Sequence, residues 1–205
     1  MLTCPSSMIL EGIVTTVSAR GEINVAPMGP FVDAEMSRLV FRPFKTAQTF
    51  RNLKEHGEGV FHVTDDVLLL ARTALGCLSP MPLLFPARKI RGQVLQESCR
   101  FYEFRVCSLD EREERARIEV EVVHCERLRD FFGFNRAKHA VVEAAILATR
   151  VDFLSFDEIQ SEFRKLAVLV EKTGGDQERQ AFAFLQDFMA RVTCATHLRT
   201  EEPKE

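Results

Sequence analysis

Tryptophan is absent from this 205-residue chain and tyrosine occurs once, so nearly all of its aromatic content comes from 17 phenylalanines. Apart from that bias the composition is ordinary. Hydrophobic residues make up 46% of the chain and charged residues 28%, as in a typical soluble globular protein. The length suits one sizeable domain, or a domain with a helical appendage.

An excess of positive charge is also missing. The chain carries 27 lysines and arginines against 30 acidic residues, which gives a formal net charge of −3. General nucleic-acid binders usually have a strongly basic balance. The composition therefore argues against a nucleic-acid partner.

The six cysteines form no CxxC pair and show no Cys/His spacing of the zinc-site kind; they stand at positions 4, 77, 99, 107, 125 and 194. We therefore expect no metal site. In a chain of this size such cysteines are most simply buried or half-buried free thiols, which indicates a reducing compartment.

Membrane and export signals are missing as well. The N-terminus lacks the basic region and long apolar run of a signal peptide. The longest uncharged run, residues 73 to 87, contains Pro80, Pro82 and Pro86 and cannot be a membrane-spanning helix. We expect a cytoplasmic protein with no membrane partner.

Common catalytic fingerprints are absent too. There is no GxSxG elbow, no P-loop and no glycine-rich dinucleotide motif, and the scattered histidines select no serine or cysteine partner. The sequence therefore gives no support for nucleophilic hydrolysis, and we assign no side chain a proton-transfer role.

What the first 130 residues do contain is a series of strand patterns. Residues 8–18 are rich in β-branched residues, a Gly21-Glu22 turn leads to a strand at 23–26, and 38–44 forms a third strand that Pro43 closes. A short helix is expected at 46–55, ended by Gly57, and a returning strand at 59–65. Asp66 is placed to cap another short helix.

Two longer alternating strands follow, around residues 100–108 and 116–123, with a charged hairpin tip between them. Their alternation predicts antiparallel strands with one wet face. The proline-rich segment 77–92 reads as an irregular loop that covers something, such as a substrate pocket or a dimer contact. About six antiparallel strands favour a closed or nearly closed barrel.

After Phe131 the hydrophobic period changes to that of helices. We predict a helix from Asn135 to about Arg150, a second from a Ser155/Glu158 capping box to Thr173, and a third capped by Asp176. The predicted fold class is thus α+β: an antiparallel split β-barrel with short helical inserts and a C-terminal helical hairpin. The predicted domains are a barrel at 1–132, a helical subdomain at 133–196 and a disordered tail at 197–205.

The stretch FRPFKTAQTFRNL, residues 41–53, gathers donors at the start of a helix. Arg42, Lys45, Thr46 and Thr49 surround its beginning, with Thr46 as the expected N-cap and no acidic residue in between. Such a cluster suits a phosphate group. The alternative is an ordinary threonine cap with two solvated cations.

The stretch NVAPMGP, residues 24–30, ends a strand with two prolines and a glycine. Its N–H donors at Val25, Ala26, Met28 and Gly29 could hydrogen-bond a flat polar heterocycle at a barrel mouth. The alternative is a strand end that proline turns away.

On the helix at 134–150, one face carries Arg136, His139, Glu143 and Arg150, and small residues line another. This face could form a second anion or substrate site. It could equally be a solvated face on which Glu143 pairs with His139 or Arg136.

Taken together, INVAPMGPF and RPFKTAQTFRNLKEHGEGVFHV resemble the flavin reductase-like split-barrel flavoproteins. Asn24 and Pro27 match the first element of that pattern, and the Lys45–Thr49 turn with Asn52-Leu53 and Gly57 matches the second. Over nearly its full length the chain resembles a small uncharacterised family of this superfamily. The stretches EGIVTT and NRAKHAVVEAAILATR carry that likeness.

The resemblance implies a homodimer that binds FMN and acts as a flavin-dependent oxidoreductase of the flavin reductase type. Its alternatives are a non-catalytic electron carrier or sensor, or a flavin-free scaffold linked to one-carbon metabolism. The implied phosphate ligands are Arg42, Lys45, Thr46 and Thr49, and the implied ring contacts are the backbone of Asn24, Val25, Ala26, Pro27, Met28 and Gly29. Arg136 and His139, from either subunit, are implied to complete the site. His62 departs from the superfamily, which often has Asn or another small polar residue there.

Overall fold

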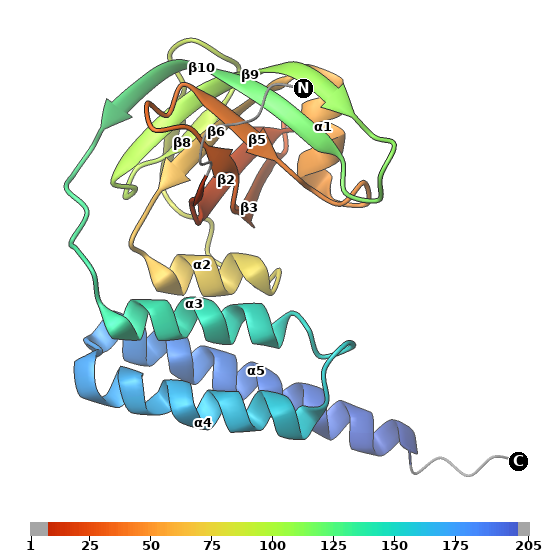
Figure 1. Ribbon diagram of the computed structural model, residues 1–205, viewed down its shortest axis with the longest axis vertical. Helices are drawn as coiled ribbons and strands as arrows, with labels where there is room; N and C mark the ends of the chain where they lie inside the picture. Colours follow the sequence, from red (N-terminus) through yellow and green to blue (C-terminus); the bar gives the residue numbers. More distant parts are fainter. Residues whose placement is uncertain (1–7, 201–205) are drawn as a thin grey trace, which may run out of the picture. The chain divides into compact units, whose positions relative to one another are not determined.

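The computed structural model describes the backbone of residues 8–200 and the side chains of residues 8–193 (Figure 1). Contacts divide the chain into two compact units. The barrel unit consists of the residues up to Asp65 together with Ser79–Phe131, and the helical unit consists of Asp66–Leu78 and the residues from Phe132 onward. The segment Asp66–Leu78 therefore groups with the helices, although its place in the sequence put it in the predicted barrel domain.

One curled antiparallel sheet forms the barrel unit. Its strands, in the order in which they pair, are β1 (Met8–Ile9), β4 (Phe31–Val32), β5 (Arg38–Phe41), β10 (Arg117–Arg127), β9 (Arg100–Asp110), β6 (Glu58–Val63), β2 (Gly12–Val17) and β3 (Ile23–Met28). Every pairing is antiparallel. The predicted antiparallel split barrel of α+β class is confirmed.

A single bent ribbon closes this barrel. Met8 pairs with Val32 and Gly12 with Met28, so the two halves of the ribbon keep one register. Between them the chain bends, and the Leu10 N–H donates to the Pro30 carbonyl across the bend (3.1 Å). One half of the ribbon joins β5 through β4, and the other half joins β6 through β2. The single strand predicted over 8–18 is therefore divided into β1 and β2, because the chain turns between them to join both edges.

A glycine is required where the ribbon crosses β6. A Cβ atom on Gly12 would lie 2.4 Å from the His62 carbonyl oxygen and 2.7 Å from the Phe61 ring. Real Cβ atoms do not approach backbone oxygens this closely. Gly12 therefore allows the close contact that closes the curl.

Phenylalanine side chains fill much of the inside of the curl. Phe41 packs against Phe61 and Phe104, with ring centroids 6.1 and 5.1 Å apart. Helix α1 (Gln48–His56) adds Phe50 and Leu53 to the same core. It ends at Gly57, whose φ of 67° is the left-handed conformation expected at a helix end.

A small hairpin covers the other face of the sheet. Strand β7 (Leu84–Pro86) lies within the segment 77–92 that was predicted to be an irregular loop, and its partner β8 (Gln93–Leu95) directly follows that segment. Val94 joins Val60 and Phe101 in a second small core beneath this hairpin. The predicted wet face of β9 is present at Arg105 and Cys107, which are exposed, but not at Glu103, which is completely buried.

Four helices make up the helical unit: α2 (Val67–Ala74), α3 (Arg136–Ala148), α4 (Phe156–Thr173) and α5 (Asp176–Thr200). Three predicted caps are confirmed, because Asp66, Asn135 and Ser155 accept hydrogen bonds from the first turns of α2, α3 and α4. The buried alanines of α3 pack against its neighbours. The tail predicted at 197–205 is helical up to Thr200, and residues 201–205 lie outside the described part.

Asp176 is the first residue of α5 and not its cap, which corrects the prediction. Glu178 takes the capping role and accepts from the Gly175 N–H at 2.8 Å. Lys138 on α3 also donates to Glu178 at 2.7 Å, with both side chains largely buried. Burial alone raises the pKa of Glu178, but the hydrogen bonds from Lys138 and Gly175 outweigh it and lower that pKa overall.

Candidate functional site

The start of α1 is uncapped. The N-cap residue is Ala47, no side chain accepts from the first turn, and that turn contains no acidic residue. Thr46 was the expected cap. It stands one residue too early, because a turn closed by the hydrogen bond from Ala47 N–H to Phe44 O (2.9 Å) precedes the helix. The positive end of the helix dipole therefore has no partner from the first turn's own side chains.

Arg42 and Lys45 both reach the tip of the β9–β10 hairpin. Arg42 Nη2 lies 2.7 Å from a Glu113 carboxylate oxygen, and Lys45 Nζ donates to the Glu111 carbonyl at 3.1 Å. The Arg42 and Glu113 side chains are 44% and 76% exposed, so this ion pair contributes little and exchanges easily. Arg42 also lines a cavity of about 190 Å³ at this tip.

Thr46 is exposed, and its hydroxyl has no hydrogen bond to the described side chains or backbone; only its carbonyl is used, by Arg51. Thr49 differs, because it is 1% exposed. Its hydroxyl accepts from Asn24 Nδ2 at 3.0 Å. Thr49 thus faces inward, toward β3.

A buried polar network joins β2, β3 and α1. Asn24 also donates to Thr16 Oγ1 (3.2 Å), and Asn52 Nδ2 donates to the same oxygen (2.9 Å). Gln48 at the start of α1 donates to Asn52 Oδ1 at 2.7 Å. The structure therefore brings the two predicted stretches, 24–30 and 41–53, together through Asn24 and Thr49. The sequence analysis matched Asn52 to a family pattern but missed its role in this junction.

Strand β3 lies at an end of the sheet, so one side of its backbone is unpaired by any described strand. Ser18 N–H donates to Glu22 O and Leu10 N–H donates to Pro30 O. Because hydrogen-bonded pairs alternate with non-hydrogen-bonded pairs, these two bonds show which residues of β3 point their N–H groups toward β2. Ala26 and Met28 consequently direct their N–H groups to β2. Val25 and Gly29 direct theirs outward, and Pro27, which has none, takes an outward position as edge prolines do. Of the four expected free donors, two are free.

His62 is fully buried beneath the β7–β8 hairpin. Its Nε2 accepts from the Leu95 N–H at 3.0 Å, so Nδ1 carries the proton and donates to Ile13 O at 3.1 Å. Burial lowers the pKa of His62 to about 3. His62 is therefore a neutral structural link between β6, β2 and β8.

Arg136 and His139 lie on the exposed side of the first turn of α3. Neither forms an ion pair or hydrogen bond through its side chain with the described residues, so the alternative pairing with Glu143 is not made. Both belong to the helical unit, and their part in a flavin site stays a prediction.

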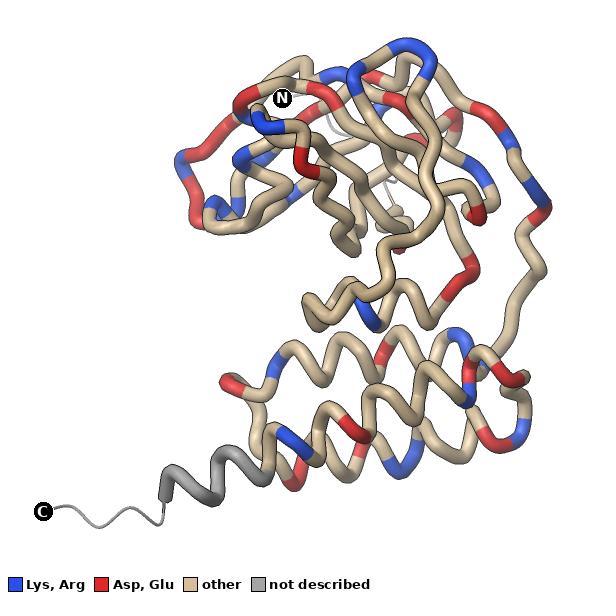
Figure 2. The backbone as a smooth tube through the Cα atoms, turned by 180° about the vertical axis from the view of Figure 1, so that it is seen from behind, with Lys and Arg blue, Asp and Glu red and all other residues tan. Residues whose placement is uncertain are grey.

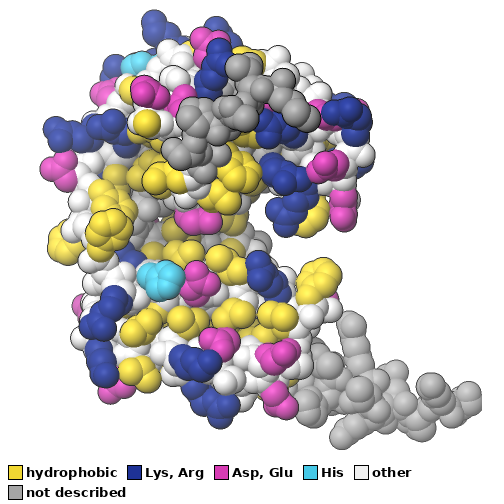
Figure 3. Space-filling model, viewed as in Figure 1, with side chains coloured by type: hydrophobic (Ala, Val, Ile, Leu, Met, Phe, Trp, Pro, Cys, Tyr) yellow, Lys and Arg dark blue, Asp and Glu magenta, His cyan; other side chains and the backbone are white. Residues whose placement is uncertain are grey.

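Among the described residues, acidic and basic side chains are interspersed along the chain. Figure 2 shows acidic and basic positions alternating along both units, and Figure 3 shows the same mixture on one face. Within residues 8–193 no group of three or more His, Cys, Asp and Glu side chains could hold a metal ion. No helix in the described part is both long and apolar enough to cross a membrane.

The cysteines correct one expectation. Cys99 is buried, but Cys77, Cys107 and Cys125 are exposed, and all four are free thiols. Burial raises the pKa of the Cys99 thiol. Cys4 and the Cys194 side chain lie outside the described residues.

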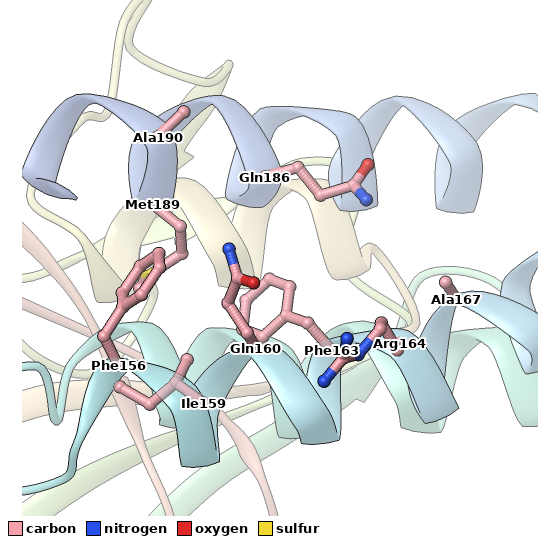
Figure 4. Close-up of a pocket in the computed structure, with 9 residues that line it drawn as sticks. All are labelled: Phe156, Ile159, Gln160, Phe163, Arg164, Ala167, Gln186, Met189 and Ala190. Carbon is pink, nitrogen blue, oxygen red and sulfur yellow. The ribbon is translucent and has the colours of Figure 1, made fainter. Parts of the chain in front are cut away.

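The helical unit has its own cavity of about 270 Å³, between α4 and α5 (Figure 4). Phe156 and Phe163 of α4 face Met189 of α5 there, with Gln160 and Gln186 at its side. Its lining holds one cation, Arg164, and no acid. This cavity contains none of the predicted site residues.

The barrel unit is a curled antiparallel sheet with a free strand edge beside an uncapped helix. This fold is that of the flavin reductase-like split barrels. Within it, the chain belongs to the family described as "Protein of unknown function (DUF447)". The N-terminal domain of that family matches residues 10–129, and its C-terminal part matches residues 135–187.

Solved structures agree with this assignment. The FMN-bound protein MM1853 from Methanosarcina mazei, of the same family, superposes with a TM-score of 0.76 at 22% identity over 89% of this chain and 96% of its own. The flavin reductase HpaC, complexed with NADP+, gives 0.51 at 16% identity over 61% and 83%. A flavoredoxin from Methanosarcina acetivorans gives 0.50 at 14% identity over 62% and 74%. No protein with a curated description matches the sequence.

Proposed function

We propose that this protein binds FMN and works as a flavin-dependent oxidoreductase of the flavin reductase type. The observation that carries the proposal is the Asn24–Thr49 hydrogen bond, which sets the free edge of β3 beside the uncapped start of α1. A flat heterocycle with a phosphate tail needs these two surfaces side by side. The FMN-bound relative of the same family supports the choice of ligand.

The phosphate end of the site is the turn before α1. Its donors are the first N–H groups of the helix, the unpaired Thr46 hydroxyl, and Arg42 and Lys45. Arg42 and Lys45 exchange Glu113 and Glu111 for the phosphate, since those surface contacts are weak. Thr49 does not contact the phosphate in this proposal. Its hydrogen bond with Asn24 holds the start of the helix in place.

The ring end of the site is the segment Asn24–Gly29. Its outer edge offers N–H groups at Val25 and Gly29 and carbonyl groups at Val25 and Pro27, so donors and acceptors are mixed along it. The pyrimidine edge of a flavin ring also mixes donors and acceptors. Ala26 and Met28 keep this edge straight through their bonds to β2. When bound, FMN supplies the electron chemistry, and the protein supplies binding, orientation and local electrostatics.

The active form in this proposal is a homodimer in the cytoplasm. Arg136 and His139, exposed and unpaired on α3, complete the site from one of the two subunits. Their free donors suit the anionic or carbonyl groups of a bound flavin.

The test compares FMN with riboflavin, which has the same ring and lacks the phosphate. The visible spectrum of the purified protein shows whether flavin is bound, and fluorescence titration of the apoprotein gives both affinities. Arg42→Ala is expected to weaken FMN about tenfold or more, because a charge-assisted hydrogen bond is lost, and to leave riboflavin unchanged. Thr46→Ala should act in the same direction with a smaller effect.

Arg91→Ala serves as the matched control, since Arg91 is exposed in the barrel unit and its side chain forms no hydrogen bond or ion pair with a described residue. Equal losses for FMN and riboflavin would place the phosphate elsewhere. A colourless protein that takes up neither flavin would end the proposal and favour the flavin-free scaffold.

Turnover needs a separate measurement, because the similar structures include both a flavin reductase and a flavoredoxin. The holoprotein is mixed with NADH or NADPH under anaerobic conditions, and the flavin absorbance is followed. Bleaching by either nucleotide supports the oxidoreductase. A flavin that both nucleotides leave oxidised favours an electron carrier or a sensor.

A further inference from the structure

The barrel unit has a second cavity, at the end of the barrel where β6 finishes and β9 begins. Its volume is about 410 Å³. Leu10, Met36, Val63 and Phe131 form an apolar wall. Helix α1 precedes the opposite end of β6, so the predicted phosphate site lies at the other end of the barrel.

Tyr102, the single tyrosine of the chain, reaches this cavity from the core. The residue is 6% exposed, and its ring packs against Phe61 with centroids 6.4 Å apart. Its hydroxyl forms no hydrogen bond with any described residue. Because Tyr102 lines the cavity, its hydroxyl is a donor available to a molecule bound there.

Two arginines face each other on the same wall. Arg100 of β9 stands directly opposite Arg127 of β10, and both line the cavity. Like charges at directly opposed positions of a sheet are destabilising unless an anion compensates them. Arg127 has Asp130, at 2.8 Å in an exposed pair, whereas Arg100 has no partner among the described residues.

The remaining charges nearby are balanced. Arg129 also lines the cavity, but it pairs with the buried Asp65 and donates to the Glu97 carbonyl. The guanidinium groups of Arg127 and Arg129 therefore each pair with a carboxylate, that of Asp130 or Asp65. The guanidinium of Arg100 has no carboxylate partner among the described residues. This charge lies two residues from Tyr102 on the same strand face.

From this geometry we infer that the cavity binds an organic carboxylate with a compact apolar body. The carboxylate accepts from the guanidinium of Arg100 and from the Tyr102 hydroxyl, and its body covers Leu10, Met36 and Val63. An arginine fork fits a carboxylate with two parallel hydrogen bonds. The volume is within the range of small-molecule sites. This site does not depend on the flavin, and either one can be present without the other.

The single tyrosine makes a direct test possible. Protein produced with 3-fluorotyrosine carries one fluorine label, at Tyr102, and gives one ¹⁹F resonance whether or not flavin is bound. Titration with cyclohexanecarboxylate or benzoate should shift this resonance until it saturates. The neutral match cyclohexylmethanol should shift it far less, because it cannot engage Arg100.

Calorimetric titration of the same carboxylates then identifies the groups. Arg100→Gln should weaken binding about tenfold, since a charge-assisted pair is lost, and Tyr102→Phe should weaken it about threefold or more. Arg91→Gln, which changes an exposed arginine outside the cavity, should bind as the original protein does. FMN binding should be the same in all these variants.

A resonance that moves with neither carboxylate overturns the inference. So does an Arg100→Gln protein that binds them with unchanged affinity, or cyclohexylmethanol binding as well as its acid. If Tyr102→Phe disturbs the core, the exposed Arg100→Gln variant and the fluorine signal still decide the question. A protein that binds carboxylates but no FMN upholds this site and refutes only the proposed function.

Discussion

His62 is a polar side chain that stabilises the fold and has no part in the proposed chemistry. Histidines often act in catalysis, and at this position the sequence departs from the pattern that it otherwise resembles. Its two ring nitrogens are both used, one on Ile13 and one on Leu95, and nothing of it is exposed. The side chain therefore links β8 to the paired strands β2 and β6.

This burial predicts a pH dependence of stability. The unfolded chain protonates His62 near its ordinary pKa of 6.5, whereas the folded protein protonates it only near a pKa of about 3. Between these values the unfolded state binds more protons, so stability falls as the pH decreases. From about pH 7 to about pH 5 the loss from this residue is about 2 kcal/mol.

Urea unfolding at the two pH values measures this loss. A His62→Gln protein should be less stable at neutral pH but should lack this part of the slope, while His139→Gln, at an exposed histidine, should keep it. Equal slopes in all three proteins would show that His62 is protonated in the folded state.

Among the single residues, the helix caps were predicted best from the sequence. Asp66, Asn135 and Ser155 cap their helices as expected, because a cap depends only on a few neighbouring residues. Thr46 and Asp176 fail for a reason that lies outside their own stretch. The turn before α1, in which Phe44 bridges to Arg115, makes the helix begin one residue later than predicted. At α5, Glu178, which pairs with Lys138, accepts the hydrogen bond from the Gly175 N–H in place of Asp176.

For the strands, pairing between segments that are distant in the sequence explains what could not be predicted from it. The alternation in 8–17 and 23–28 indicates a hairpin, but its bend depends on β5 and β6, which come later in the chain. The β7–β8 hairpin was missed because three-residue strands among prolines carry little periodic signal. Its presence then changed Glu103 from an expected surface residue into a buried one.

Glu103 is the main polar anchor of that hairpin. Its two carboxylate oxygens accept from the backbone N–H groups of Arg88 and Lys89, each at 2.7 Å. Glu103→Gln replaces one acceptor by a donor and leaves one buried N–H unpaired, so we expect a loss of about 2–3 kcal/mol in the free energy of unfolding.

Hydrogen exchange localises the effect. Amides in residues 84–95 should exchange faster in Glu103→Gln, and those of the helical unit should not change. Glu121→Gln, at an exposed glutamate of the neighbouring strand, is the control and should leave both stability and exchange unaltered. Unchanged exchange in the hairpin would mean that its other contacts, among them the Leu95–His62 hydrogen bond and the packing on Phe101, hold it without Glu103.

At the scale of the whole molecule, the barrel places Asn24 and Thr49 together, and the helical unit carries Arg136 and His139. The family relative covers 89% of the chain and therefore shares both units. The sequence indicated both units and the motifs of each. It could not indicate from which subunit of the proposed homodimer the predicted Arg136 contact would come, because assembly depends on surfaces and not on a motif.

Mixing two variant subunits decides that point, given the proposed FMN-binding homodimer. Arg42→Ala and Arg136→Ala should each weaken FMN binding, while Arg150→Ala, near the far end of α3, should not. The two weak variants are unfolded together, refolded in equal amounts and titrated with FMN. If Arg136 comes from the partner subunit, half of the dimers are mixed and each has one intact site, so about a quarter of all sites bind normally. If Arg136 serves its own subunit, every site lacks one arginine and no tight binding returns. An Arg136→Ala protein that binds FMN as the original does would remove α3 from the site altogether.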